Sequence, residues 1–463
     1  MDKKQQTSEQ ITNEIKENKM GTMPVGKLML SMSLPAMFSM LIQALYNIVD
    51  SIFVAMVGDK ALAAVSLVFP IQILIIAVAV GTGVGLNSLI SRRLGEKRFE
   101  EADNVASHGM ILSFFSWIIF AIFGLFFSGT FVQSFTDSNV VVNYGISYCT
   151  IVTVFSLFIF VQVTVEKILQ ATGNMLIPMI CMLVGAITNI ILDPILIFGL
   201  FGVPRMEIAG AAISTVFAQF VSMVFGLIFL FTKKHEVHVK LKGVRFQLKT
   251  IKNIYSVGLP AMIMQAIGSV MLVGMNAILI TFSEAAVNIL GIYFKLQSFI
   301  FMPVFGLNQG TMPILGYNYG AKNSERLMKA FKLALLTAII IMTIGAIIFQ
   351  VFPAQLISLF NATDEMLEIG TRALRIISLC FIPAAIGIMT STLFQAIGHG
   401  FLSLWVSMMR QLILILPLTW LLSHYLGLNY AWYSFPLAEI FALAASILFY
   451  IKIYKKEIKP YRD

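Results

Sequence analysis

Twelve long apolar stretches limit what this chain can fold into. Each is about 20 residues or longer, the length that a helix needs to cross roughly 30 Å of hydrocarbon. Only 12% of the residues are charged, whereas a soluble globular chain carries about 25%. We therefore predict an all-α integral membrane protein with twelve transmembrane helices. The predicted spans are 28–57, 61–90, 104–128, 140–170, 175–200, 207–232, 253–282, 286–317, 327–350, 366–397, 402–425 and 428–453.

Lysine and arginine are spread unevenly over the loops that join these spans. They gather in both tails and in the loops at 92–98, 233–252 and 322–332, whereas the alternate loops hold only Lys60 and Arg205. Basic loops of membrane proteins stay in the cytoplasm. We therefore predict a multi-pass plasma-membrane protein whose N- and C-termini are both cytoplasmic. The same distribution explains the net charge of +9 without a nucleic-acid partner.

Three short motifs recur in the second half of the chain, each displaced by 225 residues. The pairs are Leu34-Pro35-Ala36-Met37 with Leu259-Pro260-Ala261-Met262, Gly95-Glu96-Lys97 with Gly320-Ala321-Lys322, and Gln170-Ala171-Thr172-Gly173 with Gln395-Ala396-Ile397-Gly398. Three matches at one displacement predict two parallel six-helix repeats with a substrate path between them. The predicted divisions are a tail at 1–19, an N-lobe at 20–231, a linker at 232–252, a C-lobe at 253–455 and a tail at 456–463.

Four carboxylates fall inside the predicted spans, where each costs about 2.5–3.5 kcal/mol at the bilayer centre and therefore needs a role. They are Asp50, Glu166, Asp193 and Glu439. Asn189 lies one turn before Asp193, and the sixth span supplies the hydroxyl groups of Ser214 and Thr215. Oxygen ligands of this kind suit a hard cation such as Na⁺, and two close carboxylates can instead share a proton. The residues leave both ions open.

Polar stripes accompany the carboxylates of the first and fourth spans. Gln43, Tyr46 and Asn47 precede Asp50 at helical spacing and therefore share its face. Gln162, Glu166 and Gln170 are likewise four residues apart in the fourth span. We predict that both stripes contact substrate. For Glu166 the alternatives are a proton relay and a structural hydrogen bond or ion pair.

The C-terminal half offers a different set of groups. Arg410 is an available partner for Glu439 in the next span, so we expect a structural ion pair there. Gln265, Met302 and Gln309 supply amide and thioether groups that we predict as substrate contacts, with ordinary helix packing as the alternative.

The motifs together resemble those of a known family. The segments 43–54 (QALYNIVDSIFV) and 58–66 (GDKALAAVS) resemble the first-helix signature of multidrug and toxic compound extrusion (MATE) transporters. So do 169–174 (LQATGN), 189–194 (NIILDP) and 210–215 (GAAIST). The resemblance covers the chain from about Met20 to Tyr454.

This resemblance implies two six-helix lobes in a V that export organic cations and related drugs by alternating access, in exchange for H⁺ or Na⁺. It implies that cation coupling, including any Na⁺ site, uses Asp50, Asn189, Asp193 and Thr215, with Ser214 as the alternative hydroxyl. It also favours Glu166 for substrate binding. Gln265, Asn276 and Gln395 stand where the NorM-like branch has acids, which places the chain nearer the DinF/MepA-like branch.

The predicted partners are small-molecule organic cations and drugs and the lipid bilayer, and we expect a monomer that is not an enzyme and needs no cofactor beyond its coupling ion. No GxxxxGK[ST] loop is present for ATP. One alternative is a lipid-linked precursor flippase, whose anionic headgroups would require basic residues in the N-lobe, where only Lys167 lies within a span. The other is an integral membrane transferase, but no HxxxxD or DDxxD pattern occurs.

Overall fold

The computed structural model describes residues 18–232, 235–240, 246–360 and 362–461, which are helical and contain no β-strand. Ten helices in these ranges are long and apolar enough to cross a membrane, and two bent helix pairs raise the number to twelve. This confirms the predicted all-α membrane fold. Most of the predicted N-terminal tail and part of the linker lie outside the described residues.

The helices of the N-terminal half begin with a short turn and end at the linker. They are α2 (Lys19–Thr22), α3 (Val25–Val57), α4 (Asp59–Gly95), α5 (Phe99–Phe126), α6 (Ser128–Gln133), α7 (Asn139–Val154), α8 (Leu157–Ala171), α9 (Leu176–Phe198), the 3₁₀ turn η1 (Leu200–Gly202) and α10 (Glu207–Thr232).

The C-terminal half repeats this plan. Its helices are α11 (Leu248–Leu279), α12 (Glu284–Gly320), α13 (Ser324–Val351), α14 (Pro353–Ser358), α15 (Asp364–Ser378), α16 (Phe381–Ala396), α17 (Gly400–Met408), the π-helix η2 (Met409–Ile415), α18 (Leu416–Leu426), α19 (Leu428–Ala431), α20 (Ser434–Ile453), the π-helix η3 (Tyr454–Ile458) and the 3₁₀ turn η4 (Lys459–Tyr461).

The backbone repeats along with the motifs, which confirms the parallel duplication. Lys97 and Lys322, 225 residues apart, both take left-handed φ angles, of 61° and 56°. Gly173 and Gly398, at the same displacement, have φ angles of 91° and 99°. The fourth and tenth spans are also both broken, by 43° between α7 and α8 and by 48° between α15 and α16. These two breaks were not predicted.

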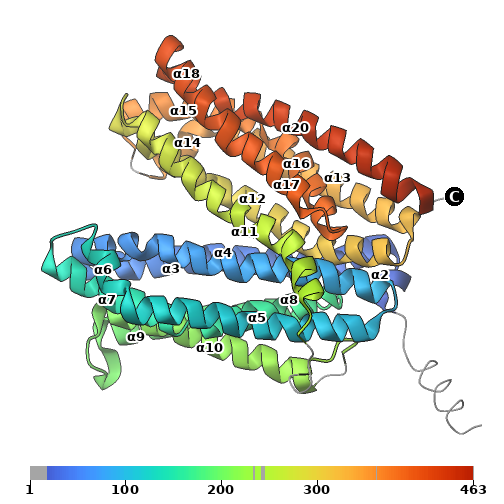
Figure 1. The fold of residues 1–463 in the computed structure, drawn as a ribbon. Helices are drawn as coiled ribbons and strands as arrows, with labels where there is room; N and C mark the ends of the chain where they lie inside the picture. The colour runs from blue at the N-terminus through green and yellow to red at the C-terminus, as the bar shows by residue number, and fades with distance from the viewer. Residues whose placement is uncertain (1–17, 233–234, 241–245, 361, 462–463) are drawn as a thin grey trace, which may run out of the picture.

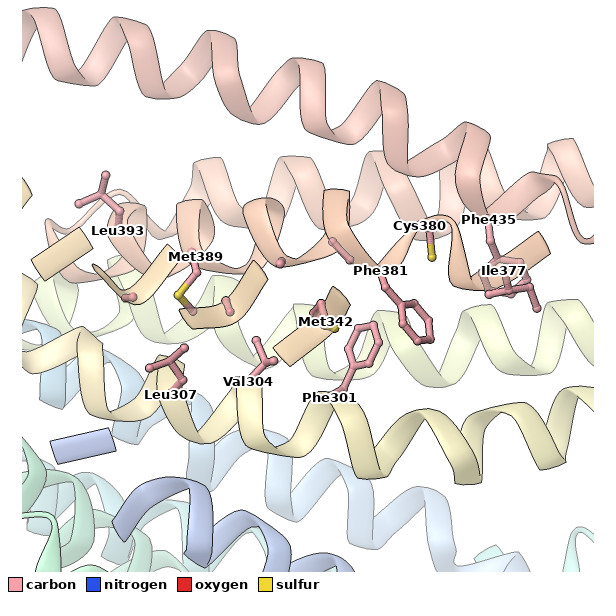
Figure 2. Close-up of a cluster of buried hydrophobic side chains, with 14 of the residues drawn as sticks. Phe301, Val304, Leu307, Met342, Ile377, Cys380, Phe381, Met389, Leu393 and Phe435 are labelled. Carbon is pink, nitrogen blue, oxygen red and sulfur yellow. The ribbon is translucent and has the colours of Figure 1, made fainter. Parts of the chain in front are cut away.

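Two helix bundles lie side by side and form a V (Figure 1). Helices α3–α10 form one bundle and α11–α20 the other; the bundles meet near α2 and diverge toward α6 and α15. The C-terminal bundle has a dense apolar core, in which Phe301 of α12 packs edge-on against Phe381 of α16 with ring centroids 5.4 Å apart (Figure 2). Such close packing replaces the hydrophobic effect as the main attraction between helices in lipid.

Where the bundles meet, glycines bring helix backbones into contact. A Cβ atom added to Gly85 of α4 would lie 2.2 Å from the carbonyl oxygen of Ile254 in α11. At the residue 225 positions later, Gly310 of α12, an added Cβ atom would lie 2.7 Å from Cα of Ser33 in α3. The two contacts are therefore equivalent in the duplicated halves, and small residues are what allow helix backbones to approach this closely.

The first helix of each half begins in the core of the other half. Leu28, Met32 and Ala36 of α3 are buried in the core cluster of the C-terminal bundle. Ile254 of α11 is buried in a cluster of the N-terminal bundle. At the starts of α3 and α11, the chain of one half therefore packs in the apolar core of the other half.

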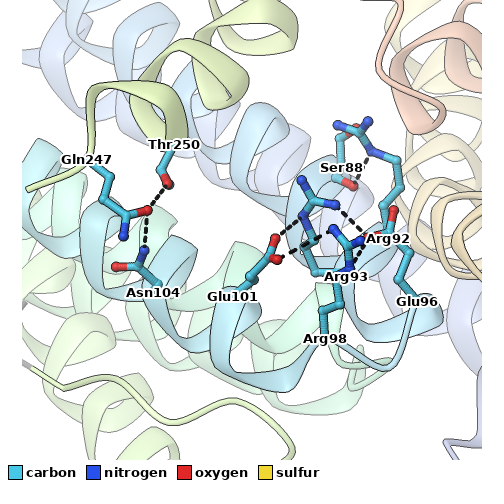
Figure 3. Close-up of polar contacts among 9 residues, drawn as sticks. All are labelled: Ser88, Arg92, Arg93, Glu96, Arg98, Glu101, Asn104, Gln247 and Thr250. Carbon is cyan, nitrogen blue, oxygen red and sulfur yellow. Dashed lines mark hydrogen bonds and ion pairs between the residues drawn. The ribbon is translucent and has the colours of Figure 1, made fainter. Parts of the chain in front are cut away.

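The loops rich in lysine and arginine lie together at the end where the bundles meet, which we call the basic end. There Arg93 bonds Glu96 at 2.5 Å and Glu101 at 3.0 Å, and Asn104 of α5 donates a hydrogen bond of 3.0 Å to Gln247 before α11 (Figure 3). Exposed ion pairs contribute little to stability, about 0–1 kcal/mol each. The main effect of these contacts is on position, because the hydrogen bond from Asn104 to Gln247 holds α5 beside the start of α11.

Candidate functional site

Five predicted residues come together in the N-terminal bundle, and we call this group the acidic site: Asp50 of α3, Asn189 and Asp193 of α9, and Ser214 and Thr215 of α10. Ser214 donates a hydrogen bond to Oδ1 of Asp193. Asn189 donates to the same oxygen at 3.4 Å and to Thr215 at 3.5 Å. The side chain of Asp50 is adjacent to that of Asp193. The i, i+4 spacing on α9 is what turns both of its polar groups toward α10.

Two oxygen atoms of this site have no hydrogen-bond partner among the described residues. They are Oδ2 of Asp193 and Oδ1 of Asn189, and both side chains are fully buried. Buried acceptors are normally paired, so these two are open for a ligand. A proton between Asp50 and Asp193, or a hard cation beside them, would satisfy the open carboxylate oxygen. No cluster of three or more His, Cys, Asp or Glu residues suited to a metal was found in the described ranges.

Sequence reasoning missed part of the surroundings of this site. Tyr148 of α7 is 3% exposed, lies close to Asp50 and accepts a hydrogen bond of 2.8 Å from Gln72 of α4. Gln72 is the only amide side chain in the apolar run from Val68 to Ala79, which is the signal that was available. Nothing local connects it with a tyrosine 76 residues away.

The residues of the polar stripe in the first span have different surroundings in the structure. The phenol of Tyr46 faces Thr215 and so adjoins the acidic site. Gln43 is half-buried, whereas Asn47 is exposed. Asp50 lies seven residues from the end of α3 and Asp193 five from the end of α9, so the site is about 10 Å from the helix ends opposite the basic end.

A second polar group lies nearer the basic end, and we call it the Lys167 network: Lys167, Gln170 and Gln309. Lys167 of α8 donates hydrogen bonds to Gln170 at 2.9 Å and to Gln309 of α12 at 3.1 Å. Glu166 does not join it, because its carboxylate accepts a bond of 3.0 Å from Gln162 on the same helix. The structure thus unites two predicted substrate residues, Gln170 and Gln309, around the ammonium group of Lys167, which the sequence analysis considered only for the flippase alternative.

The remaining predicted residues lie in the C-terminal half, apart from both groups. Arg410, on the π-helix η2, forms an ion pair of 3.3 Å with Glu439 of α20. Gln265 is exposed on α11 and Met302 is half-buried on α12. The structure joins neither of these two to the acidic site or to the Lys167 network by a hydrogen bond within the described residues.

Comparison with known proteins identifies the family. The MatE family model matches the chain twice, over residues 35–195 and 260–421. The chain belongs to the MatE family. The two matches begin 225 residues apart, so the family model also reports the duplication. MatE proteins are transporters, which confirms the predicted transport function and the absence of enzymatic activity.

Relatives of this MatE protein match over nearly its whole length. The multidrug export protein MepA of Staphylococcus haemolyticus is 27% identical over 414 residues, which cover 89% of this chain and 90% of the relative. A FAD transporter of Shewanella oneidensis is 26% identical over 421 residues, covering 90% and 92%. The likeness to MepA proteins confirms the predicted MepA-like branch.

Solved structures of the family share the fold. One is the outward-facing conformation of a multidrug resistance MATE transporter of the MOP superfamily, with a TM-score of 0.89, 29% identity and coverage of 95% and 98%. Another is a MOP superfamily transporter from Pyrococcus furiosus for which a reversed polarity of the binding pocket suggests a different function, with a TM-score of 0.88, 29% identity and coverage of 95% and 99%. They confirm the two-lobed architecture.

Proposed function

We propose that this MatE protein is a secondary active multidrug exporter that expels organic cations and related drugs in exchange for H⁺ or Na⁺. The observation that carries this proposal is the acidic site, with two carboxyl groups side by side and buried acceptor oxygens left open. A cation that enters from outside neutralises these oxygens and supplies the driving force. The similarity to multidrug export proteins supports drugs as substrates.

The arrangement of the lobes supports alternating access. Both lobes touch at the basic end through backbone contacts at Gly85 and Gly310, and the helices diverge at the other end. We assign the basic end, with both termini, to the cytoplasm, because basic loops stay on that side. The acidic site then lies in the outer half of the plasma membrane, where a cation from outside reaches it first. Substrate loads from the cytoplasm when the lobes separate there, close to Glu166.

One polypeptide contains both lobes, so a monomer is sufficient for transport. The N-lobe, 20–231, contains all five residues of the acidic site, and the C-lobe, 253–455, moves against it. The half-buried side chains near the lobe contact, Gln43, Met302 and Gln309, then contact substrate as it passes.

The test is ethidium efflux from proteoliposomes under separately imposed Na⁺ and H⁺ gradients. Wild type is expected to export ethidium under one of the two gradients, and Asp50→Asn is expected to lose that efflux. Asp59→Asn is the matched control, because Asp59 is an exposed aspartate at the start of α4. Undiminished efflux by Asp50→Asn, or no efflux by wild type under either gradient, would contradict the proposal.

A further inference from the structure

Lys167 is a buried cation whose nearest acid, the neighbouring Glu166, acts on it electrostatically but forms no ion pair with it. It is 7% exposed, and within the described residues no carboxylate lies within ion-pair distance of its ammonium group. Its stem packs so closely on α4 that a Cβ atom added to Gly83 would lie 2.6 Å from Cγ of Lys167. The stem of the side chain is therefore packed against the backbone of α4.

Two neutral amides now compensate this charge. Gln170 accepts from the ammonium at 2.9 Å and Gln309 at 3.1 Å. Glu166, the next residue along the chain, is bonded to Gln162 instead. Amide oxygens stabilise a buried ammonium less well than an anion does, because bonds between two charged groups are the strongest. Ionisable residues inside membrane spans commonly mark substrate pathways.

One of these amides belongs to the other lobe. Gln309 lies on α12 of the C-terminal bundle, whereas Lys167 lies on α8 of the N-terminal bundle. This bond therefore exists only while the lobes are packed together at the basic end. When they separate there, Lys167 keeps Gln170 but loses Gln309, and the ammonium faces the widening gap.

We propose that Lys167 binds a phosphate or carboxylate group of a soluble organic substrate when the lobes are apart at the basic end. When the lobes close, Gln309 replaces the anionic group on the ammonium and the substrate is released toward the opposite end. The inference rests on the proposed function in its use of alternating access. It extends the substrate class from organic cations to compounds that also carry an anionic group.

The test compares two competitors that differ only by a phosphate, flavin mononucleotide and riboflavin. Each is added on the cytoplasmic side of phosphatidylcholine proteoliposomes during ethidium efflux. With wild type, we expect flavin mononucleotide to inhibit at a concentration about tenfold lower than riboflavin, the ratio for one charge-assisted hydrogen bond. In Lys167→Gln the two flavins should inhibit equally, whereas Lys167→Arg should keep most of the difference.

Lys295→Gln is the matched control, because Lys295 is an exposed lysine within the span of α12. It should keep the full preference for flavin mononucleotide. Equal inhibition by both flavins in wild type, or an unchanged preference in Lys167→Gln, would overturn the proposal. Loss of the preference when phosphatidylglycerol is added would assign the site to a lipid phosphate and overturn the assignment to a soluble substrate.

A second variant covers the case in which Lys167→Gln does not fold. Gln309→Leu keeps the ammonium but removes the amide that displaces the anion, so the preference for flavin mononucleotide should rise. An unchanged preference would count against the exchange at Lys167. If wild type does not export ethidium, the proposed function fails, and equilibrium dialysis of the two flavins against the purified protein then tests the anion site by itself.

Discussion

The acidic site and the Lys167 network differ in how they relate to the two lobes. All five residues of the acidic site belong to α3, α9 and α10 of one lobe, and the site lies away from the basic end. The Lys167 network joins α8 of one lobe to α12 of the other, near the basic end. One lobe alone can thus build the acidic site, whereas the network requires both lobes in contact.

This difference separates two tasks of a coupled transporter. A site within one lobe can take up or lose a cation in either arrangement of the lobes. A contact between lobes exists in only one arrangement, so it changes whenever the lobes move. Coupling requires that ion binding and lobe movement influence each other, and reciprocity makes that influence equal in both directions.

The largest expected effect is on the acidic site. Asp193→Asn should lower gradient-driven ethidium efflux about 100-fold, near the upper range of coupling between two sites, because the open carboxylate oxygen is lost. The lobes should still pack at the basic end. Asp364→Asn, at an exposed aspartate at the start of α15, is the control and should transport normally. Efflux within twofold of wild type in Asp193→Asn would remove the acidic site from the mechanism.

The next effect concerns the lobe contact. Gly85→Ala forces a methyl group to within 2.2 Å of the carbonyl oxygen of Ile254. Overpacking of about 2 kcal/mol should shift the ratio of the two lobe arrangements about thirtyfold away from contact at the basic end. Spin labels at Lys60 and Thr281, at the opposite end, should then report shorter distances.

The matched control for this shift is Gly291→Ala, because a Cβ atom at Gly291 meets nothing within 4 Å. It should leave the label distances unchanged. Identical distance distributions in Gly85→Ala and wild type would show that the glycine contact does not select the lobe arrangement.

A smaller effect is expected at the hydroxyl group that bonds Asp193. Ser214→Ala removes the donor to Oδ1 of Asp193 and should change the coupling-cation concentration for half-maximal efflux about tenfold, as for one hydrogen bond to a charged group. Ser66→Ala is the control, because Ser66 is an exposed serine whose hydroxyl group donates to the carbonyl oxygen of Leu62 in its own helix. Equal effects of the two substitutions would contradict a specific role for Ser214.

The smallest effect is a pH dependence of stability at the basic end. Burial raises the pKa of Glu236 in the linker, although Asn18 donates a hydrogen bond of 2.7 Å to its carboxylate. A raised carboxyl pKa means that the folded protein holds this proton more tightly than the unfolded chain. The stability that Glu236 contributes to the folded protein is therefore greatest at low pH. It is lost as the pH rises from about 4.3, the ordinary pKa of a glutamate, through the raised pKa of Glu236.

Thermal unfolding between pH 4 and pH 8 measures this contribution. Glu236→Gln should unfold with a shallower decline on raising the pH, because no carboxyl group is left to ionise. Glu284→Gln, at an exposed glutamate at the start of α12, should decline as wild type does. A decline in Glu236→Gln as steep as in wild type would exclude Glu236 as the cause.

Span number, span position and duplication were predictable because each depends on local signals. The length of the apolar run predicted a span at 61–90, and the corresponding helix α4 covers Asp59–Gly95, only a few residues more at each end. The breaks in the fourth and tenth spans were not predictable in this way. The fourth span breaks at Phe155-Ser156, where the sequence has no proline or glycine. The tenth breaks at Leu379-Cys380, and Pro383 lacks the N–H that would bond the carbonyl group of Leu379, which is a local signal that apolar length does not include.

The pattern of residues along the chain determined the twelve spans, the repeat of 225 residues and the polar company of Asp50 and Asp193, because periodicity and burial cost act over a few helical turns. Only the tertiary structure decided that the first helix of each half starts in the other core, and that Lys167 meets Gln309, 142 residues away. Contacts of this kind depend on how whole helices pack, and backbone approach at glycines such as Gly85 sets that packing.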